Sequence, residues 1–213
     1  MCMAYAEVLK RIIMSMRRSL TVRDIDIRQA LLAEMQMRHS KEPGTRVVEE
    51  LSLCQGVSRV DIAVVNGSLS GYEIKSEKDT LDRLPAQRDV YSLIFDYVTV
   101  VASRKHVSKV MEIVPDWWGI DIAESRGQKV ELKKKRKARL NKEIQPQALV
   151  QLLWKDEALS ILESKGLAVG YRSKSKKIIW SHLAENLTPT ELRALVRQQL
   201  KVRANWRVDA PQT

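Results

Sequence analysis

The stretch VDIAVVNGSLSGYEIK, residues 60–75, decides the fold of this 213-residue chain. It holds two apolar segments separated by Asn-Gly, the pattern of two antiparallel strands joined by a tight turn. Side chains alternate across a strand, so Glu73 and Lys75 should share one face of the resulting sheet. Asp61 and Glu73 beside a lysine on a half-buried sheet are costly unless something compensates them, such as a divalent cation. Such a cation usually serves phosphate chemistry.

The segments on both sides of this hairpin predict a mixed α/β domain. Helices are expected over residues 4–16, from Asp24 or Asp26 to about residue 39, over 80–95 with an early bend at Pro85, and over 106–113. Further strands are expected over 51–53, 97–101 and 117–123, with an edge strand over 130–132, and residues 45–50 are expected to form a short helical turn. This order of elements fits a mixed β-sheet flanked by helices.

The acids and the lysine of the hairpin resemble a known signature. Asp61, eleven intervening residues and Glu73-Ile74-Lys75 are similar to the motif of the PD-(D/E)XK nuclease superfamily. Gln87 and Tyr91 resemble the extra Gln-x-x-x-Tyr motif of its RecB-type branch. The resemblance covers about residues 45–125 and implies a restriction-endonuclease-like core, although Val60 stands where the name-giving motif has proline.

This resemblance implies a Mg²⁺- or Mn²⁺-dependent nuclease. Asp61 and Glu73 would hold the cation through hard oxygen ligands, which Mg²⁺ prefers. Glu50 would supply a further ligand from the preceding helical turn, with Glu49 as the alternative. The cation would lower the pKa of a bound water and stabilise the charge that develops on the phosphate.

Three more residues complete the implied site. Lys75 would orient the attacking water or help to deprotonate it, and would offset charge on the scissile phosphate. Gln87 and Tyr91 lie one helical turn apart, so they would face the same site and position phosphate or metal-bound waters. The alternative for Lys75 is a salt bridge with one acid on a solvated sheet face.

The turn at Gly67 provides a geometric test of this site. A strict two-residue Asn-Gly turn would set Val65 opposite Ser68 and Asp61 opposite Tyr72, which separates Asp61 from Glu73 across the sheet. An odd-length loop centred on Gly67, or one bulge, sets Asp61 opposite Glu73. We therefore predict the odd loop or the bulge.

Basic charge is concentrated in the C-terminal part of the chain. The formal net charge is +11, yet residues 1–128 carry 18 Lys/Arg and 18 Asp/Glu. The excess therefore lies in residues 129–213, and an asymmetry of this size favours a polyanionic partner, for which DNA is the expected choice. We expect a nuclease-like core over 1–132, a basic linker over 133–144 and a basic helical module over 145–213.

The C-terminal module carries a second resemblance. A helix ending at Gly166-Leu167, a basic loop and another helix resemble SAP-type helix-extension-helix DNA-binding motifs, with a packing or dimerisation appendage as the alternative. Lysines and arginines in loops and at helix starts contact phosphates in a sequence-tolerant, salt-sensitive way. The basic residues expected to contact nucleic acid flank the candidate site or lie in the linker and the basic loop: Arg59, Arg83, Lys133, Lys134, Lys135, Arg136, Arg172, Lys174, Lys176 and Lys177.

Composition excludes several other classes of protein. The chain has no run of about 18 apolar residues, so no membrane-spanning helix is expected. No amphipathic helix pairs a basic face with bulky aromatics, so a membrane partner is not expected either. Its first 20 residues lack the continuous apolar core of a secretory signal, which makes the cytoplasm the default location. Cys2 and Cys54 are isolated thiols without metal-ligand spacing.

The sequence therefore predicts a metal-dependent nuclease that hydrolyses the phosphodiester bonds of DNA. The resemblance implies a bacterial or phage-borne protein with a role in repair, mobile elements or phage defence. The alternative function is a catalytically silent DNA-binding protein on the same fold. By analogy with the superfamily, a homodimer is compatible with either function.

Overall fold

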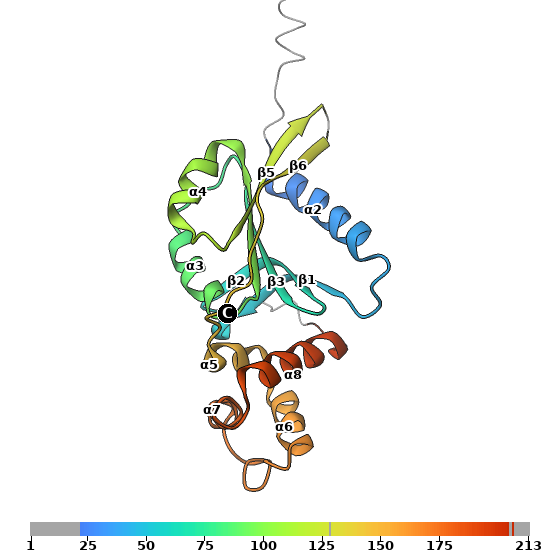
Figure 1. Cartoon of the computed structure of the whole chain (residues 1–213), viewed down its shortest axis with the longest axis vertical. Coiled ribbons are helices and arrows are strands. Elements are labelled where there is room, and N and C mark those ends of the chain that lie inside the picture. Colours follow the sequence, from blue (N-terminus) through green and yellow to red (C-terminus); the bar gives the residue numbers. More distant parts are fainter. Residues whose placement is uncertain (1–21, 128, 205, 207–213) are drawn as a thin grey trace, which may run out of the picture.

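A six-stranded sheet forms the centre of the molecule (Figure 1). In the computed structural model, the described residues are 22–127, 129–204 and 206. The strands follow one another across the sheet in chain order: β1 Arg46–Leu53, β2 Ser58–Val65, β3 Leu69–Lys75, β4 Tyr97–Ser103, β5 Gly119–Arg126 and β6 Lys129–Arg136.

The sheet is mixed in strand direction. β2 runs antiparallel to both β1 and β3, β3, β4 and β5 are parallel to one another, and β6 is antiparallel to β5. Parallel neighbours need crossover connections, which α3 (Leu84–Ser92) and α4 (Val107–Ile113) provide. The predicted fold class, a mixed α/β sheet flanked by helices, is confirmed.

Helix α2 (Asp24–His39) covers one face of the sheet, and α3 and α4 cover the other (Figure 1). The buried side chains of α2 are Ile27, Leu31 and Met35, which recur every four residues and so form one helix face. They pack in one apolar cluster with Ile62 and Ile74 of the central hairpin. This packing sets the distance at which polar groups of α2 meet β2 and β3.

The C-terminal helices pack below the sheet, next to β1 and β2 (Figure 1). Buried side chains of the sheet layer, such as Phe95 and Trp118, belong to the same apolar cluster as Leu149 and Leu192 of these helices. The predicted helical module is therefore part of a common core. The helices of this module are α5 Pro146–Leu149, α6 Lys155–Ser164, α7 Lys176–Asn186 and α8 Pro189–Val202, with the 3-10 turn η3 Val150–Leu152 after α5. Two further 3-10 turns, η1 Cys54–Gly56 and η2 Arg104–His106, lie in the sheet part.

The predicted basic linker is wrong in its first part. Lys133 to Arg136 belong to strand β6, because long basic side chains are tolerated on an exposed edge strand. The remaining segment is fixed to the sheet layer by main-chain bonds, among them Asn141 N to Asp96 O at 2.8 Å and Gln145 N to Leu93 O at 2.9 Å. The segment between sheet and helices is thus an ordered connection.

Other expected elements differ in their limits. Residues 46–50 extend strand β1 and do not form a helical turn, because they pair with β2 through Glu49 and Ile62. The helix expected over 80–95 is confined to α3, with Pro85 in its first turn. The N-cap of α2 is Arg23, and the carboxylate of Asp26 accepts the Arg23 N–H.

Two further expectations concern the ends and the environment of the chain. The helix expected over residues 4–16 lies outside the described residues. Among the helices of the C-terminal part, α8 has Thr188 as its N-cap and Glu191 completing the capping box. Across the described segments, no helix has both the length and the apolar character needed to cross a membrane.

Candidate functional site

The hairpin β2–β3 has the register that the candidate site requires. Val65 pairs with Leu69 and Ile62 with Tyr72, so the loop between the strands has three residues and is centred on Gly67. This confirms the predicted odd loop. The same register, continued by one residue, sets Asp61 opposite Glu73.

Strands β2 and β3 are bridged by side chains at this point. The Ile74 N–H donates to Asp61 Oδ2 at 2.7 Å, so a carboxylate accepts the main-chain hydrogen bond where the ladder ends. Nearby, the Tyr91 hydroxyl lies 2.6 Å from Arg59 O. The opening between the strands therefore places polar side chains at the centre of the sheet.

Glu73, Lys75, Gln87 and Tyr91 form one connected network. Lys75 Nζ donates to Glu73 Oε1 at 2.7 Å and to Gln87 Oε1 at 3.1 Å, and Gln87 Nε2 donates to Glu73 Oε1 at 2.7 Å. The Tyr91 hydroxyl lies 2.7 Å from Glu73 Oε2. Since Glu73 and Lys75 are only 3% and 4% exposed, the network belongs to the core and is no surface salt bridge.

Helix α3 supplies the two residues that hold Glu73 in place. Gln87 and Tyr91 are one turn apart on this helix, as the sequence predicts, and both reach the same carboxylate. Burial, and then the negative charge of Glu73, raise the pKa of the Tyr91 hydroxyl above its usual range. Tyr91 therefore remains protonated and able to donate.

The environment of Asp61 disfavours the ionised form of its carboxyl group. Burial, and then the negative charge of Glu73, raise the pKa of Asp61 to about 7. The bond from Ile74 N–H and the charge of Arg28 act in the opposite direction. An Asp carboxyl that stays costly to ionise is a sign that a further positive charge would be favourable here.

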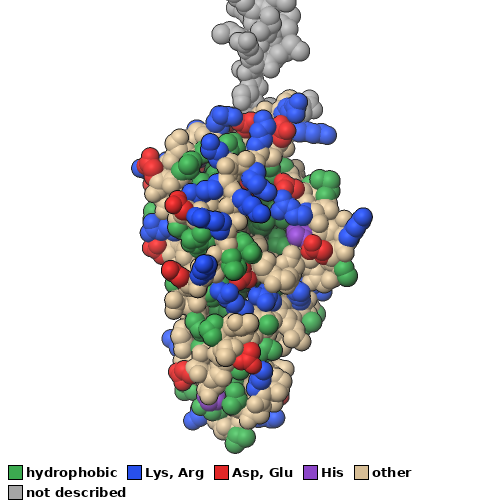
Figure 2. Space-filling view, viewed as in Figure 1, with side chains coloured by type: hydrophobic (Ala, Val, Ile, Leu, Met, Phe, Trp, Pro, Cys, Tyr) green, Lys and Arg blue, Asp and Glu red, His purple; other side chains and the backbone are tan. Residues whose placement is uncertain are grey.

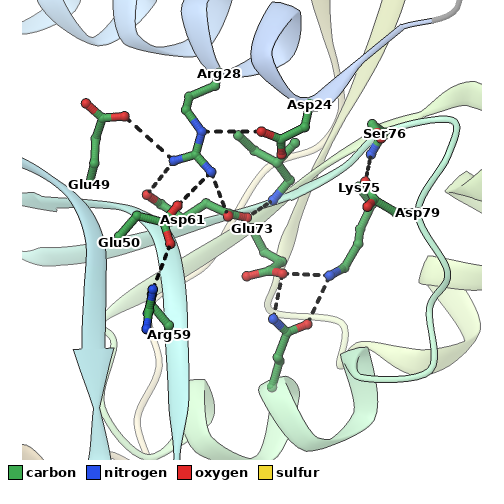
Figure 3. A network of polar contacts seen from close by, with 12 residues as sticks. Asp24, Arg28, Glu49, Glu50, Arg59, Asp61, Glu73, Lys75, Ser76 and Asp79 are labelled. Carbon is green, nitrogen blue, oxygen red and sulfur yellow. Dashed lines mark hydrogen bonds and ion pairs between the residues drawn. The ribbon is translucent and has the colours of Figure 1, made fainter. Parts of the chain in front are cut away.

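Arg28 of α2 is a member of the site that the sequence did not reveal. Its Nη2 lies 2.9 Å from Asp61 Oδ1 and 2.8 Å from Glu50 Oε1, and its Nη1 donates to Asp61 O at 3.1 Å (Figure 3). Burial lowers the pKa of Arg28, but the charges of Asp61, Asp24 and Glu50 outweigh this and leave it raised. The only local signal was an Asp24–Arg28 spacing of four residues, which is common on helices.

Glu50 lies on strand β1 and not on a helical turn, which corrects the expected source of this acid. It faces Arg28 on one side and lies 3.8 Å from Arg59 Nη1 on the other. Its backbone φ is 54°, in the left-handed region that is unfavourable for residues other than glycine. Glu49 is more distant, with its Oε2 3.7 Å from Arg28 Nη1.

The donor chemistry around Asp61 suits a hard divalent cation only in part. Asp61 and Glu73 face one another across the open end of the ladder and offer carboxylate oxygens, which Mg²⁺ and Mn²⁺ favour. The third acid, Glu50, is directed toward Arg28 (Figure 3). Among the described residues, no three His, Cys, Asp or Glu side chains are grouped so that they could hold a metal ion.

The basic residues predicted to contact nucleic acid do not form one patch. Those of β6 and those between α6 and α7 lie at opposite ends of the long axis (Figure 1). Arg59 lies beside the acid cluster, and Arg83 is exposed at the start of α3. Figure 2 shows Lys and Arg side chains spread over the upper and middle parts of one face and sparse toward its lower end.

Several of these basic side chains are already engaged within the protein. Arg136 donates to Trp118 O at 2.7 Å and to Pro115 O at 3.0 Å, so it fixes the loop before β5. Lys133 pairs with Glu124 at 3.0 Å, and Arg172 pairs with Glu163 at 2.8 Å. Lys176 lies over the ring of Trp180.

Four predicted phosphate contacts remain: Lys134, Lys135, Lys174 and Lys177. Lys135, Lys174 and Lys177 are exposed, and Lys134 acts on the buried carboxyl of Asp121 by its charge. Phosphate contact by these four residues therefore stays a prediction.

Comparison with known proteins finds one family. A family model described as bacteriophage P4 protein cII matches residues 17–209. Protein cII of Enterobacteria phage P4 is 26% identical over 182 residues, which cover 85% of this chain and 68% of that protein. A solved structure of a protein of unknown function from Silicibacter pomeroyi is 23% identical, with a TM-score of 0.37, over 68% of this chain and 94% of that one.

Proposed function

The chain belongs to the bacteriophage P4 protein cII family, and we propose that it is a metal-dependent nuclease acting on DNA. The proposal is carried by one observation: Asp61, Glu73, Lys75, Gln87 and Tyr91, which the sequence singles out over 31 positions, converge at the open end of the β2–β3 ladder. A buried carboxylate–lysine pair adds little to stability compared with apolar packing. The presence of this pair beside a second carboxylate is better explained by chemistry.

The proposed cation would be Mg²⁺ or Mn²⁺, held by Asp61 and Glu73. When bound, it supplies charge stabilisation at the phosphate and a more acidic water. Hydrolysis forms one P–O bond to the water oxygen and breaks one P–O ester bond, which leaves a phosphate and a free hydroxyl. The protein's part would be to hold these groups in place.

Each residue of the network has a role that its contacts support. Lys75 keeps an ammonium next to Glu73, where it would offset charge on a bound phosphate and orient the attacking water. Gln87 and Tyr91 fix both oxygens of the Glu73 carboxylate, so its orientation needs no adjustment during reaction. Asp61 contributes the opposing carboxylate.

The finer fold class belongs to the same proposal. The acidic residue Glu50, Asp61 on the next strand, the Glu73-Lys75 pair on its hairpin partner and Gln87 on the following helix occur in the order that a restriction-endonuclease-like core requires. The mixed sheet with helices on both faces supports this class. The net charge of +11 supports a nucleic acid as substrate.

One observation favours the alternative, a DNA-binding protein without catalysis. The guanidinium of Arg28 already pairs with Asp61 and Glu50, so part of the negative charge of the acid cluster is balanced without a cation. On that alternative the protein would retain DNA without cutting it, and its affinity would not depend on Mg²⁺.

A cleavage assay separates the two functions. Purified protein is incubated with linear and with circular DNA in Mg²⁺, in Mn²⁺ and in chelator. We expect cleavage that requires the cation and that is lost in Asp61→Asn and in Lys75→Met. The exposed neighbours Asp89→Asn and Lys78→Met are matched controls that should keep it. Cleavage that survives Asp61→Asn would refute the nuclease, and binding without cleavage in the wild type would support the alternative.

A further inference from the structure

A hollow lies on helix α7 and the loop before it, at the end of the molecule opposite β6 (Figure 1). Its volume is about 270 Å³. This is close to the lower limit of about 300 Å³ for pockets that hold small molecules, so the hollow suits one small planar group. Six residues line it: Tyr171, Lys177, Ile178, Ser181, His182 and Glu185.

Two of the lining residues form a flat aromatic surface. The ring centroids of Tyr171 and His182 are 3.8 Å apart, and the ring planes differ by 11°. Asn186 Nδ2 lies 3.1 Å from His182 Nδ1 and helps to fix the imidazole. The main chain of Tyr171 is held by two bonds of 3.0 Å, from Tyr171 N to Ala168 O and from Lys174 N to Tyr171 O. The stacked pair is therefore in place before any ligand arrives.

The hollow is bordered by a strongly basic segment. Residues 165–177, which form the basic loop and the start of α7, contain five Lys/Arg and no Asp/Glu. Arg172, Lys174 and Lys177 are exposed. The pair of Arg172 with Glu163 lies at the surface, with side chains 79% and 45% exposed, so it is weak and can be exchanged for another anion. Aromatic rings beside a positively charged segment are the means by which proteins bind single-stranded nucleic acid.

We propose that this hollow binds one unpaired base of single-stranded DNA, which stacks on the Tyr171–His182 pair while the basic loop contacts the neighbouring phosphates. A base within a duplex has both faces covered by its neighbours, so only an unpaired base can lie on the rings. Ser181 and Glu185 offer polar groups to the edge of the base, and Ile178, 48% exposed, offers an apolar contact. The inference rests on the proposed function only in taking DNA as the ligand.

Binding of oligonucleotides in the presence of chelator tests this proposal. Fluorescence anisotropy compares an oligothymidylate, an abasic strand of the same length and a duplex of the same length. We expect the wild type to bind the oligothymidylate more tightly than the abasic strand by about 5- to 100-fold, because only the former has bases to stack. Tyr171→Leu should remove most of this difference and leave the affinity for the duplex unchanged. Tyr171→Phe keeps the ring and should retain the difference.

A second variant tests the same hollow without removal of a ring. Ser181→Leu places a larger apolar side chain in the cavity, so it should weaken binding of the oligothymidylate as Tyr171→Leu does. Ser160→Leu, at an exposed serine of α6, is the matched control and should bind as the wild type does. Thermal unfolding shows which variants are folded, and Ser181→Leu decides if Tyr171→Leu is not.

The outcomes separate this inference from the proposed nuclease. Equal affinity of the wild type for the oligothymidylate and the abasic strand overturns base stacking. An unchanged affinity for oligothymidylate in the folded variants, or a loss in Tyr171→Leu that is equally large for the duplex, overturns it too. None of these results affects the cleavage assay, and a wild type that does not cleave DNA leaves the binding comparison in chelator valid.

Discussion

Burial and the negative charge of Glu73 both disfavour the ionised form of Asp61, and the result can be measured as a dependence of stability on pH. Its pKa is raised from 3.8 to about 7, first by burial and then by Glu73. A carboxyl whose folded-state pKa is raised contributes full stability below pH 3.8 and loses it as the pH rises through about 7. In the absence of metal, Asp61 therefore weakens the fold at neutral and alkaline pH.

We accordingly expect Asp61→Asn to stabilise the metal-free protein at pH 8 by on the order of 2–4 kcal/mol, because the variant has no charge to bury. The gain should shrink toward zero as the pH falls to about 4, where the wild-type carboxyl is also neutral. Urea unfolding with chelator at several pH values measures the free energy of unfolding. Asp89→Asn, whose side chain is 67% exposed, is the control. A gain that is larger at acidic pH would contradict the raised pKa.

The sequence revealed the residues of this network better than their surroundings. Asp61, Glu73, Lys75, Gln87 and Tyr91 could be predicted because strand alternation and helix periodicity fix which side chains share a face. Arg28 could not, because it reaches Asp61 from a helix 33 residues earlier in the chain. Contacts of that kind depend on how α2 packs on the sheet, and no local sequence pattern specifies that packing.

Among the secondary-structure elements, strand β1 is irregular at Glu50. Glu50 has a φ of 54°, yet the residues on both sides of it keep their pairing with β2. Val48 and Leu51 are three residues apart but pack in the same apolar cluster, which strict alternation would forbid. The strand therefore changes face at Glu50 and turns this side chain toward Arg28.

This conformation leads to a comparison of two substitutions at one position. Glu50→Ala and Glu50→Gly both remove the carboxylate, but glycine adopts a positive φ without steric cost. We expect Glu50→Gly to be more stable than Glu50→Ala by about 1 kcal/mol. At Glu49, where φ is not positive, glycine should be the less stable of the two.

Thermal or urea unfolding of the four variants gives this comparison directly. Equal stability of alanine and glycine at position 50 would show that the left-handed conformation is not maintained in solution. The two strands whose limits were not predicted correctly from the sequence, β1 and β6, are obscured for related reasons. The pair Glu49-Glu50 interrupts the apolar alternation of β1, and the run of basic residues hides β6, although both segments form ladder pairs.

At the scale of the whole molecule, the sheet and the C-terminal helices are joined by Asp96. This buried carboxylate accepts the Leu69 N–H at 2.7 Å and faces Arg197 at 3.4 Å and Arg193 at 3.7 Å. Both arginines come from α8, so one side chain links β3 to the last helix. Together with the shared apolar cluster, this contact leads us to expect that the two parts unfold as one cooperative unit.

We therefore expect a single thermal transition for the full chain. Asp96→Asn should lower the free energy of unfolding by about 2–3 kcal/mol, because two partly buried arginines lose their counter-charge. The transition should shift without splitting. Differential scanning calorimetry measures both properties, and Asp116→Asn, a surface acid that is 90% exposed, serves as control. Two separate transitions, of which Asp96→Asn shifts only one, would show that the helical part unfolds independently.

The distribution of basic charge leads to a prediction about nucleic-acid binding. Residues 129–144 hold eight Lys/Arg and two Asp/Glu, so more than half of the excess of +11 lies on β6 and the segment after it. The basic loop before α7 is a separate group at the other end of the molecule (Figure 1). If this loop contacts phosphates, its charges act locally and not only through the net charge of the protein.

We expect a variant in which Arg172, Lys174, Lys176 and Lys177 become Gln to bind DNA more weakly and with a smaller dependence on salt. Each lost phosphate contact lowers the slope of log K against log salt by about 0.9, so the slope should fall by about 2–4. The matched control converts four exposed basic residues elsewhere to Gln and lowers the net charge equally: Arg23, Arg38, Lys41 and Lys109. Fluorescence anisotropy over a range of salt concentrations measures both slopes. An equal fall in the two variants would mean that the loop acts only through net charge, and that the DNA contacts lie along β6.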